Sequence, residues 1–172
     1  KKGYPVLVMA RRVELLEQLP IQDKVVAQVD VTDIKQVTNA IKKAEAIYGS
    51  VDLLVNNAGI MPLAKYLDQP LADKNAMVDT NLKGVINGMD AVLPAMVERN
   101  HGTIVNVSSI AGRYSSVDHA VYNATKFGLI GLTEAVRKEN ARRNVRFILV
   151  EPGIVATDLL KATKDQQILD DY

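Results

Sequence analysis

The sequence alternates five short apolar segments with longer segments of helical periodicity. The apolar segments are rich in Val, Ile and Leu and lack the apolar–polar alternation of a strand with one face in water. They are residues 5–10, 24–30, 51–56, 102–108 and 144–151. Uniformly apolar runs of this length are typical of parallel strands that are buried on both faces.

Three of the intervening segments predict helices. They are residues 33–48, with Thr32 or Asp33 as the N-cap, residues 71–99 and residues 121–141. Because strands and helices alternate, we expect an α/β fold with a Rossmann-type, doubly wound parallel sheet in three α/β/α layers. No internal repeat or low-complexity linker divides the chain, so residues 1–172 are expected to form one domain.

The start of the chain lacks a feature that this pattern normally has. A Rossmann unit opens with a strand and a glycine-rich turn that holds a pyrophosphate, but no GxGxxG occurs in this sequence. In the strand order 3-2-1-4-5-6, the absent strand would lie between the strands at 5–10 and 51–56. We therefore expect the sequence to be incomplete by roughly 20 to 30 residues in front, about one strand, turn and helix. The tail at 157–172 adds no further strand, and a loss is expected there too.

Composition and charge narrow the function. The chain carries 21 Lys and Arg against 20 Asp and Glu, spread without a basic stripe, which argues against binding to nucleic acid or to an anionic membrane. The absence of cysteine excludes disulfides and thiol catalysis, and two histidines without an HExxH pattern give no expected metal site. No apolar run reaches membrane-spanning length, so the expected location is the cytoplasm.

A tyrosine and a lysine lie one helical turn apart in the segment DHAVYNATKFG. Tyr122 and Lys126 should share a helix face. A phenol titrates near pH 10, and acid–base work near neutrality requires lowering that pKa at a cost of about 3 to 4 kcal/mol. An ammonium at about 4 to 5 Å supplies roughly that amount at an effective dielectric constant of about 20. The alternative is ordinary polarity on a wet helix face, which an isolated YxxxK match favours.

Further polar residues lie at strand ends or within helices. Ser109 follows the strand at 102–108 and precedes Tyr122 by 13 residues, at the sheet edge where α/β proteins bind ligands. Asn56-Asn57-Ala58-Gly59 ends another strand, where small residues permit a flat ligand to approach the backbone. Asn81 is an amide in an apolar helical context, as expected of a helix distortion or a water anchor. Each of these also has a plain structural interpretation, as a turn residue or a helix residue.

Together these residues resemble the short-chain dehydrogenase/reductase family. The resemblance rests on NNAG (56–59), Asn81, Ser109, YxxxK (122–126) and PG (152–153), in this order and spacing, and it runs from about residue 5 to about residue 160. Within the family, the segments VLPAMVERNHGTIVNVSSIAG and VEPGIVATDL are most similar to the bacterial NADP-dependent 3-hydroxy acid and clavulanate dehydrogenase branch.

The resemblance implies a role for each residue. Tyr122 would be the general acid–base residue, Lys126 would lower its pKa and bind the nicotinamide ribose, Ser109 would orient the substrate oxygen, and Asn81 would hold a water for proton relay. The remaining cofactor contacts would be Asp30 and Val31 at the adenine, Asn57, Ala58 and Gly59 at the adenosine side, and Pro152, Gly153, Val155 and Thr157 at the nicotinamide amide and phosphates. His101 is expected to be a turn residue, and His119 at most a substrate-side contact.

The cofactor preference follows from the first strand. A carboxylate at its end would bind the ribose 2′-OH and repel a 2′-phosphate, but Ala10 stands there and Arg11 and Arg12 follow. Guanidinium groups donate planar, charge-assisted hydrogen bonds to phosphate, which favours NADP(H) over NAD. The alternative is that these arginines begin a solvated helix, where the helix dipole disfavours cations.

The expected activity is an NADP-dependent interconversion of a small secondary alcohol and its ketone, with 3-hydroxy acids favoured. The alternatives are a 3-oxoacyl reductase acting on carrier-bound chains, or a non-catalytic NADP-binding regulatory protein. Small residues at Ala124, Gly128 and Gly131, and at Gly84 and Gly88, permit close helix contacts, and the resemblance implies a homodimer or homotetramer. Packing against the chain's own sheet explains the same glycines.

Overall fold

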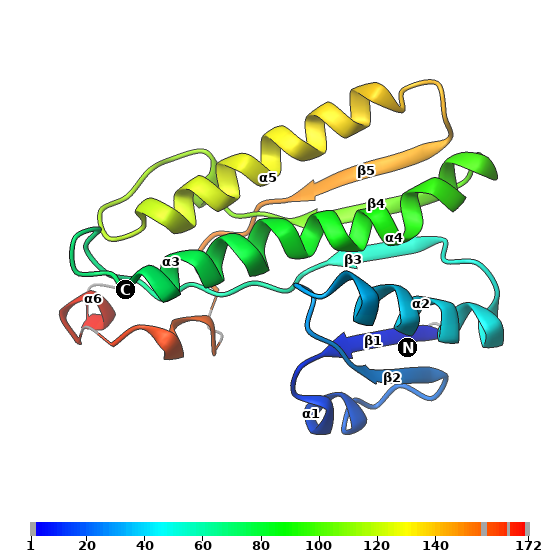
Figure 1. Ribbon diagram of the computed structural model, residues 1–172, viewed down its shortest axis with the longest axis horizontal. Helices are drawn as coiled ribbons and strands as arrows, with labels where there is room; N and C mark the ends of the chain where they lie inside the picture. Colours follow the sequence, from blue (N-terminus) through cyan, green and yellow to red (C-terminus); the bar gives the residue numbers. More distant parts are fainter. Residues whose placement is uncertain (1–2, 156–157, 165, 171–172) are drawn as a thin grey trace.

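The computed structural model of the chain describes residues 3–155, 158–164 and 166–170. These residues form strands that all pair in parallel, which confirms the α/β class (Figure 1). The strands are β1 (Val6–Ala10), β2 (Lys24–Gln28), β3 (Leu53–Asn56), β4 (Gly102–Val107) and β5 (Val145–Val150). Each predicted strand is therefore present, with ends within two residues of those expected.

The strands divide into two sheets. Strand β1 pairs with β2 in the register Val6 to Lys24, and β4 lies between β3 and β5. Within the described residues, no ladder joins β1 to β3. This break lies at the position where the predicted strand order places a further strand.

The helices follow the predicted segments, with additions. They are α1 (Val13–Glu17), α2 (Ile34–Tyr48), α3 (Leu71–Val78), α4 (Gly84–Glu98), α5 (Ala120–Glu139) and α6 (Gln166–Asp170). Asp33 is the N-cap of α2, since its carboxylate accepts from the backbone N–H groups of Lys35 and Gln36. Sequence periodicity missed the short helices α1 and α6. A π-helical turn, Asp79–Lys83, interrupts the single helix predicted over 71–99.

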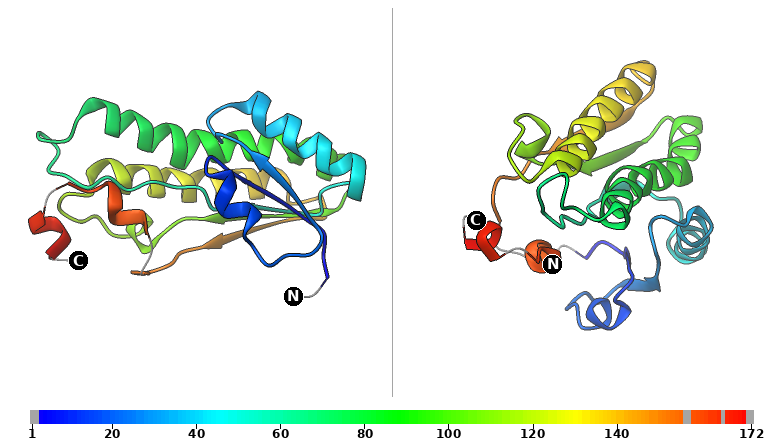
Figure 2. Two further views of the ribbon diagram at one scale, coloured as in Figure 1. Left: turned by 90° about the horizontal axis from the view of Figure 1, so that it is seen from below. Right: turned by 60° about the vertical axis from the view of Figure 1, so that its left-hand side comes forward.

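The three long helices α2, α4 and α5 lie on one face of the strands (Figures 1 and 2). The main core forms between this helical layer and the strands, around Val37, Met89, Ile104 and Leu129. In β3, Leu54 faces this core and is 7% exposed, whereas its neighbours Leu53 and Val55 are 56% and 52% exposed. The core therefore holds the helices on one side of the sheet and leaves apolar strand residues uncovered on the other.

Contacts through α4 hold the β1–β2 pair against the larger sheet. Helix α4 packs on α2, and its Asn87 donates a hydrogen bond of 2.8 Å to the carbonyl oxygen of Val31, just beyond β2. Gly84 permits the approach, because a Cβ there would lie 2.7 Å from Cγ2 of Val31. The loop after β2 is thus fixed relative to the sheet that carries the candidate site.

None of the described helices combines the length and the hydrophobicity needed to span a bilayer.

Candidate active site

The carboxyl ends of β3, β4 and β5 meet at one edge of the larger sheet (Figure 1). Two backbone hydrogen bonds continue the β4–β5 pairing beyond the strands, from Ser108 N to Val150 O at 2.8 Å and from Ile110 N to Pro152 O at 3.0 Å. The Pro152–Gly153 turn therefore lies beside the segment that follows β4. This is the edge at which ligands bind in open α/β sheets.

Lys126 is buried at this edge, with 6% of its surface exposed. Its Nζ donates to the carbonyl oxygen of Val107 at 3.0 Å, and its own carbonyl oxygen accepts from the Ser108 hydroxyl at 3.2 Å. Within the part of the chain that the structure describes, no carboxylate forms an ion pair with it. Burial lowers the pKa of Lys126 from 10.5 to about 8, because desolvation disfavours the charged form.

Tyr122 lies beside this ammonium, as the four-residue spacing predicted. The Lys126 Nζ is 5.6 Å from the centroid of the Tyr122 ring. The ring also makes an edge contact with His119, at 6.3 Å between centroids. Tyr122 and Lys126 both lie in the first turns of α5, so the helix itself sets their separation.

The Tyr122 ring belongs to a second apolar cluster. Tyr122 is 5% exposed and packs in a group that includes Met61, Met77 and Ile168 of α6. The Thr163 hydroxyl accepts from Leu63 N at 3.1 Å, which ties the segment before α6 to the loop after β3. The carboxyl-terminal segment therefore covers the phenol in this structure, a contact that sequence pattern did not suggest.

Ser109 begins the loop between β4 and α5. It caps a short 3-10 turn, Ile110–Gly112, and its Oγ accepts from the backbone N–H of Ala111 at 3.1 Å. Among the described residues, none accepts a hydrogen bond from the Ser109 hydroxyl in return. The hydroxyl proton thus remains available to a ligand.

Asn81 lies in the π-helical turn and is 1% exposed. Its side-chain oxygen accepts from Ile60 N at 2.8 Å, and its Nδ2 donates to Ile60 O at 2.9 Å. A Cβ placed on Gly59 would lie 3.5 Å from this oxygen and 4.0 Å from the Lys126 Nζ. The predicted helix distortion takes the form of a π turn, and the amide holds the end of the NNAG segment next to Lys126.

The residues predicted to bind the adenosine half of a cofactor lie apart from this group, around the ends of β1 and β2. Arg11 and Arg12 are exposed after β1, and the Arg12 guanidinium makes a long ion pair of 3.9 Å with Asp158. The backbone N–H and the hydroxyl of Thr32 donate to Asp30 and lower the pKa of its carboxyl group. Val31 is held by α4 as described above.

The other predicted cofactor residues lie at the larger sheet's carboxyl edge. Asn57 and Ala58 are exposed after β3, and Gly153 and Val155 are exposed after β5, next to the half-buried Pro152. Thr157 lies outside the described residues. The structure thus brings Gly59, Asn81, Tyr122 and Lys126 together and places Ser109 beside Pro152, while the adenosine group forms a separate cluster.

Sequence reasoning missed two sets of buried amides. Asn56 Nδ2 donates to Asn106 Oδ1 at 2.8 Å, and Asn106 Nδ2 donates to the Thr133 hydroxyl at 2.9 Å, which links β3, β4 and α5. Asn123, next to Tyr122, is 5% exposed and bonds to the loop after β4. The available signal was a polar residue at an otherwise apolar strand or helix position, as for Asn81.

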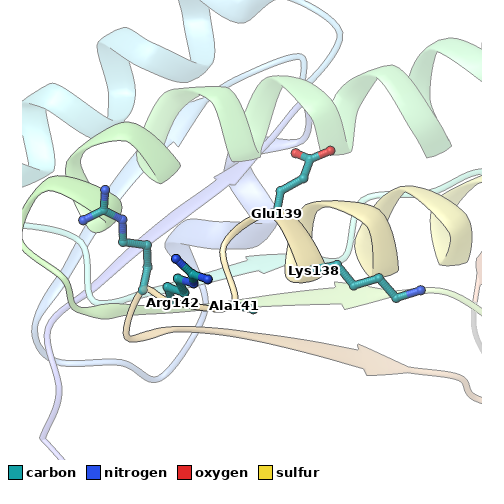
Figure 3. A pocket seen from close by; sticks show the side chains of 5 residues that line it. Lys138, Glu139, Ala141 and Arg142 are labelled. Carbon is teal, nitrogen blue, oxygen red and sulfur yellow. The ribbon is translucent and has the colours of Figure 1, made fainter.

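A hollow of about 530 Å³ lies at the carboxyl-terminal end of α5 (Figure 3). Tyr122 lies at the other end of this helix. Lys138, Glu139, Ala141, Arg142 and Arg143 line the hollow. These side chains are exposed, and the hollow contains none of the predicted catalytic residues.

The strand order defines an α/β protein, and the buried tyrosine–lysine pair lies at the carboxyl edge of its larger parallel sheet. The sequence profile of the short chain dehydrogenases matches residues 1–168, and the chain belongs to this family. It is thus an oxidoreductase of that family, as predicted, whereas the 3-hydroxy acid branch stays a prediction.

Two curated relatives illustrate the match. An uncharacterized oxidoreductase of Staphylococcus saprophyticus is 36% identical over 99% of this chain and 72% of its own length. The 3-oxoacyl-acyl-carrier-protein reductase of Thermotoga maritima is 41% identical over 76% of this chain and 53% of its own length. The match thus spans about half the length of the Thermotoga enzyme.

Solved structures share the fold. Serine dehydrogenase from Escherichia coli superposes with a TM-score of 0.84 at 34% identity, covering 89% of this chain and 73% of that chain. A closed form of serine dehydrogenase complexed with NADP+ superposes with a TM-score of 0.88 at 30% identity, covering 98% of this chain and 71% of that one. The predicted Rossmann-like α/β fold is confirmed.

Proposed function

We propose that this protein is an NADP(H)-dependent oxidoreductase that interconverts a secondary alcohol and a ketone, with Tyr122 as the acid–base residue. The observation that carries the proposal is the buried Lys126 ammonium, 5.6 Å from the Tyr122 ring at the carboxyl edge of the sheet. A buried ammonium without a carboxylate partner is costly, and its presence is explained when it stabilises a phenolate and binds a ligand hydroxyl.

The residues fit an NADP(H) cofactor by their chemistry. Arg11 and Arg12 offer exposed guanidinium groups that suit a 2′-phosphate. Lys126 has three donors, and Val107 is the one acceptor for them among the described residues. Two solved structures similar to this chain hold NADP, the closed serine dehydrogenase at 30% identity and ElxO at 32% identity. When bound, the reduced nicotinamide would supply the hydride.

The proton is the task of this chain's own residues. Tyr122 would give its phenolic proton to the ketone oxygen during reduction and would take it back from the alcohol in the reverse direction. An ammonium about 5 Å away stabilises the resulting phenolate by about 3 kcal/mol at an effective dielectric constant near 20. An interaction of this sign would lower the pKa of the phenol.

Ser109 would orient the substrate oxygen. Its Oγ already accepts from Ala111 N, so its remaining proton can be donated to a carbonyl oxygen beside the phenol. Asn81 would act by holding Ile60 and Gly59 next to Lys126, and a water at this group would connect the lysine to solvent.

The substrate class has two candidates. A small 3-hydroxy acid is favoured by the structural likeness to serine dehydrogenase, which covers 89% of this chain. A 3-oxoacyl chain on a carrier protein is supported by the 41% identity to the Thermotoga reductase over 130 residues. A non-catalytic role is disfavoured because Ser109, Tyr122 and Lys126 are all present.

The test is a turnover assay. The protein is mixed with NADPH and, in separate reactions, with 3-oxo acids, simple ketones and a 3-oxoacyl thioester, and the loss of absorbance of the reduced nicotinamide is followed. Oxidation with one substrate class identifies the reaction. Tight NADPH binding with no turnover across the panel would refute the enzyme and leave the regulatory alternative.

We also propose a homo-oligomer formed through α4 and α5. Ile86 of α4 and Phe127 of α5 are 36% and 45% exposed, although both are large apolar side chains. An interface that buries them would explain this exposure. Light scattering after size exclusion measures the mass, and Phe127→Asp should shift a dimer or tetramer to a smaller species.

A further inference from the structure

A buried side chain of α5 hydrogen-bonds to the loop between β4 and α5, residues 109–118. Asn123 is 5% exposed and follows Tyr122 directly. Its Nδ2 donates to Ala111 O at 2.7 Å and to Tyr114 O at 3.0 Å, and its Oδ1 accepts from Ser116 N at 3.2 Å. Both donors of the amide and one lone pair of its oxygen are used on this loop.

Little else among the described contacts fastens the middle of the loop. Tyr114 and Val117 are 74% and 79% exposed, so their burial does not hold it. The bidentate ion pair from Arg113 to Glu151 is at the surface, where such pairs are weak. The backbone hydrogen bonds of Gly112, Arg113 and Tyr114 run within the loop itself. Gly112 packs against Lys126 and Ile130 of α5, and Asn123 provides the buried side-chain hydrogen bonds from α5 to the loop.

The position of the loop matters for the proposed reaction because Ser109 lies at its start. Ser109 is its first residue, and the Oγ orientation depends on the hydrogen bond from Ala111 N. The carbonyl of the same Ala111 is bound by Asn123. A shift of Ala111 would therefore move the donor that orients Ser109, while Tyr122 stays fixed in the helix.

We propose that Asn123 is a positioning residue for the reaction proposed above. It fixes the loop that begins at Ser109 relative to the first turns of α5, which carry Tyr122. The inference rests on that proposed function. Both reacting side chains then share one rigid frame, and the substrate oxygen can meet the serine hydroxyl and the phenol together. Misplacement of such groups by about 1 Å lowers rates by about 100-fold.

The test compares Asn123→Ala with Asn140→Ala in the full chain. Asn140 is a matched control, since it ends the same helix and its Nδ2 donates within that helix, to Val136 O at 2.9 Å. For N123A we expect kcat to fall roughly 10- to 100-fold, with the NADPH Kd within about twofold and the pH profile of the residual activity unchanged. N140A should leave all three parameters unchanged.

Hydrogen exchange provides a readout that does not depend on turnover. In N123A the amides of residues 111–116 should exchange about tenfold faster or more, while those of β4 and the interior of α5 should not change. Asn123→Ser keeps one donor and serves as a milder variant if N123A does not fold; its kcat and its loop exchange should lie between those of N123A and the wild type.

The outcomes separate the two proposals. Faster loop exchange with a kcat within twofold of the wild type in both Asn123 variants overturns the positioning role alone. Unchanged loop exchange overturns the link itself. A wild-type chain that binds NADPH but turns over no substrate overturns the proposed function, and the positioning role with it.

Discussion

Both ends of helix α5 carry positive charge, but the charge is buried at one end and exposed at the other. Near its start, a single lysine, Lys126, is 6% exposed and touches Tyr122 and two residues at the end of β4. Near its end, Lys138, Arg142 and Arg143 surround a hollow of about 530 Å³ and are exposed (Figure 3). The exposed end carries more positive charge, but the buried ammonium lies beside the proposed acid–base residue.

The difference teaches which property marks a reactive site. An exposed cation is solvated, so it can attract anions but has little effect on the pKa of a neighbouring group. A desolvated cation is unstable alone and acts strongly on a group beside it. The predictions below alter each end of α5 in turn, from the largest expected effect to the smallest.

Replacing Tyr122 with Phe should lower kcat by roughly 1000-fold or more, because the proton donor is removed and the ring packing is kept. NADPH affinity, measured by the change in its fluorescence, should remain within about twofold. Substantial turnover in Y122F would assign the proton transfer to another group and would contradict the proposal that Tyr122, beside Lys126, is the acid–base residue.

Replacing Lys126 with Met should lower kcat by roughly 100-fold. Without the ammonium the phenol pKa rises, so the acidic limb of the alcohol oxidation profile, where activity falls as Tyr122 becomes protonated, should move to higher pH. The measurement is kcat against pH for the wild type and K126M. A profile that keeps its midpoint in K126M contradicts the electrostatic coupling.

The same substitution should stabilise the fold by about 1 to 3 kcal/mol, since it removes the desolvation of a buried charge but also the hydrogen bond to Val107 O.

The pH dependence of stability follows from the lysine pKa. Because the pKa of Lys126 is about 8 in the folded state and that of an ordinary solvated lysine is 10.5, the unfolded chain binds more protons between these pH values. The free energy of unfolding of the wild type relative to K126M should therefore rise from pH 8 to pH 10.5. Urea unfolding of both proteins at several pH values measures this rise, and parallel curves would show that Lys126 is not desolvated.

Neutralising the exposed charges near the end of α5 should have the smallest effect on the reaction rate. In a Lys138→Gln, Arg142→Gln double variant, kcat and KM for a small ketone should stay within about twofold, because exposed charges far along the helix act weakly across salt solution. Steady-state kinetics at two ionic strengths provide the check. A large loss of kcat would show that the two ends of α5 are coupled.

Local sequence rules were sufficient where the determinants are local. The strands were recognisable from their apolar runs, and the four-residue spacing placed Tyr122 beside Lys126, because helix geometry alone fixes that pair. The caps were partly recognisable, since both Thr32 and Asp33 suit an N-cap and only the structure shows that Asp33 is used.

Long-range contacts were beyond such rules. The function of Asn123 depends on the path of a loop that ends before it, and the burial of Tyr122 depends on Ile168, 46 positions further along the chain. The π turn contains Asn81, whose side chain forms two hydrogen bonds with the backbone of Ile60, far away in the sequence. Propensity and periodicity contain no term for these contacts.

The π turn also sets the angular phase of everything that follows it. A π turn carries one residue more than an α turn, and each residue advances a helix by about 100°. Deleting one residue from 79–83 would turn α4 about its axis, carrying Asn87 away from Val31 and Gly88 away from Asn56. The one extra residue of the π turn thus gives α4 the rotation about its axis that its contacts with both sheets require. Single-residue insertions or deletions in 79–83 should therefore be tolerated far less than substitutions.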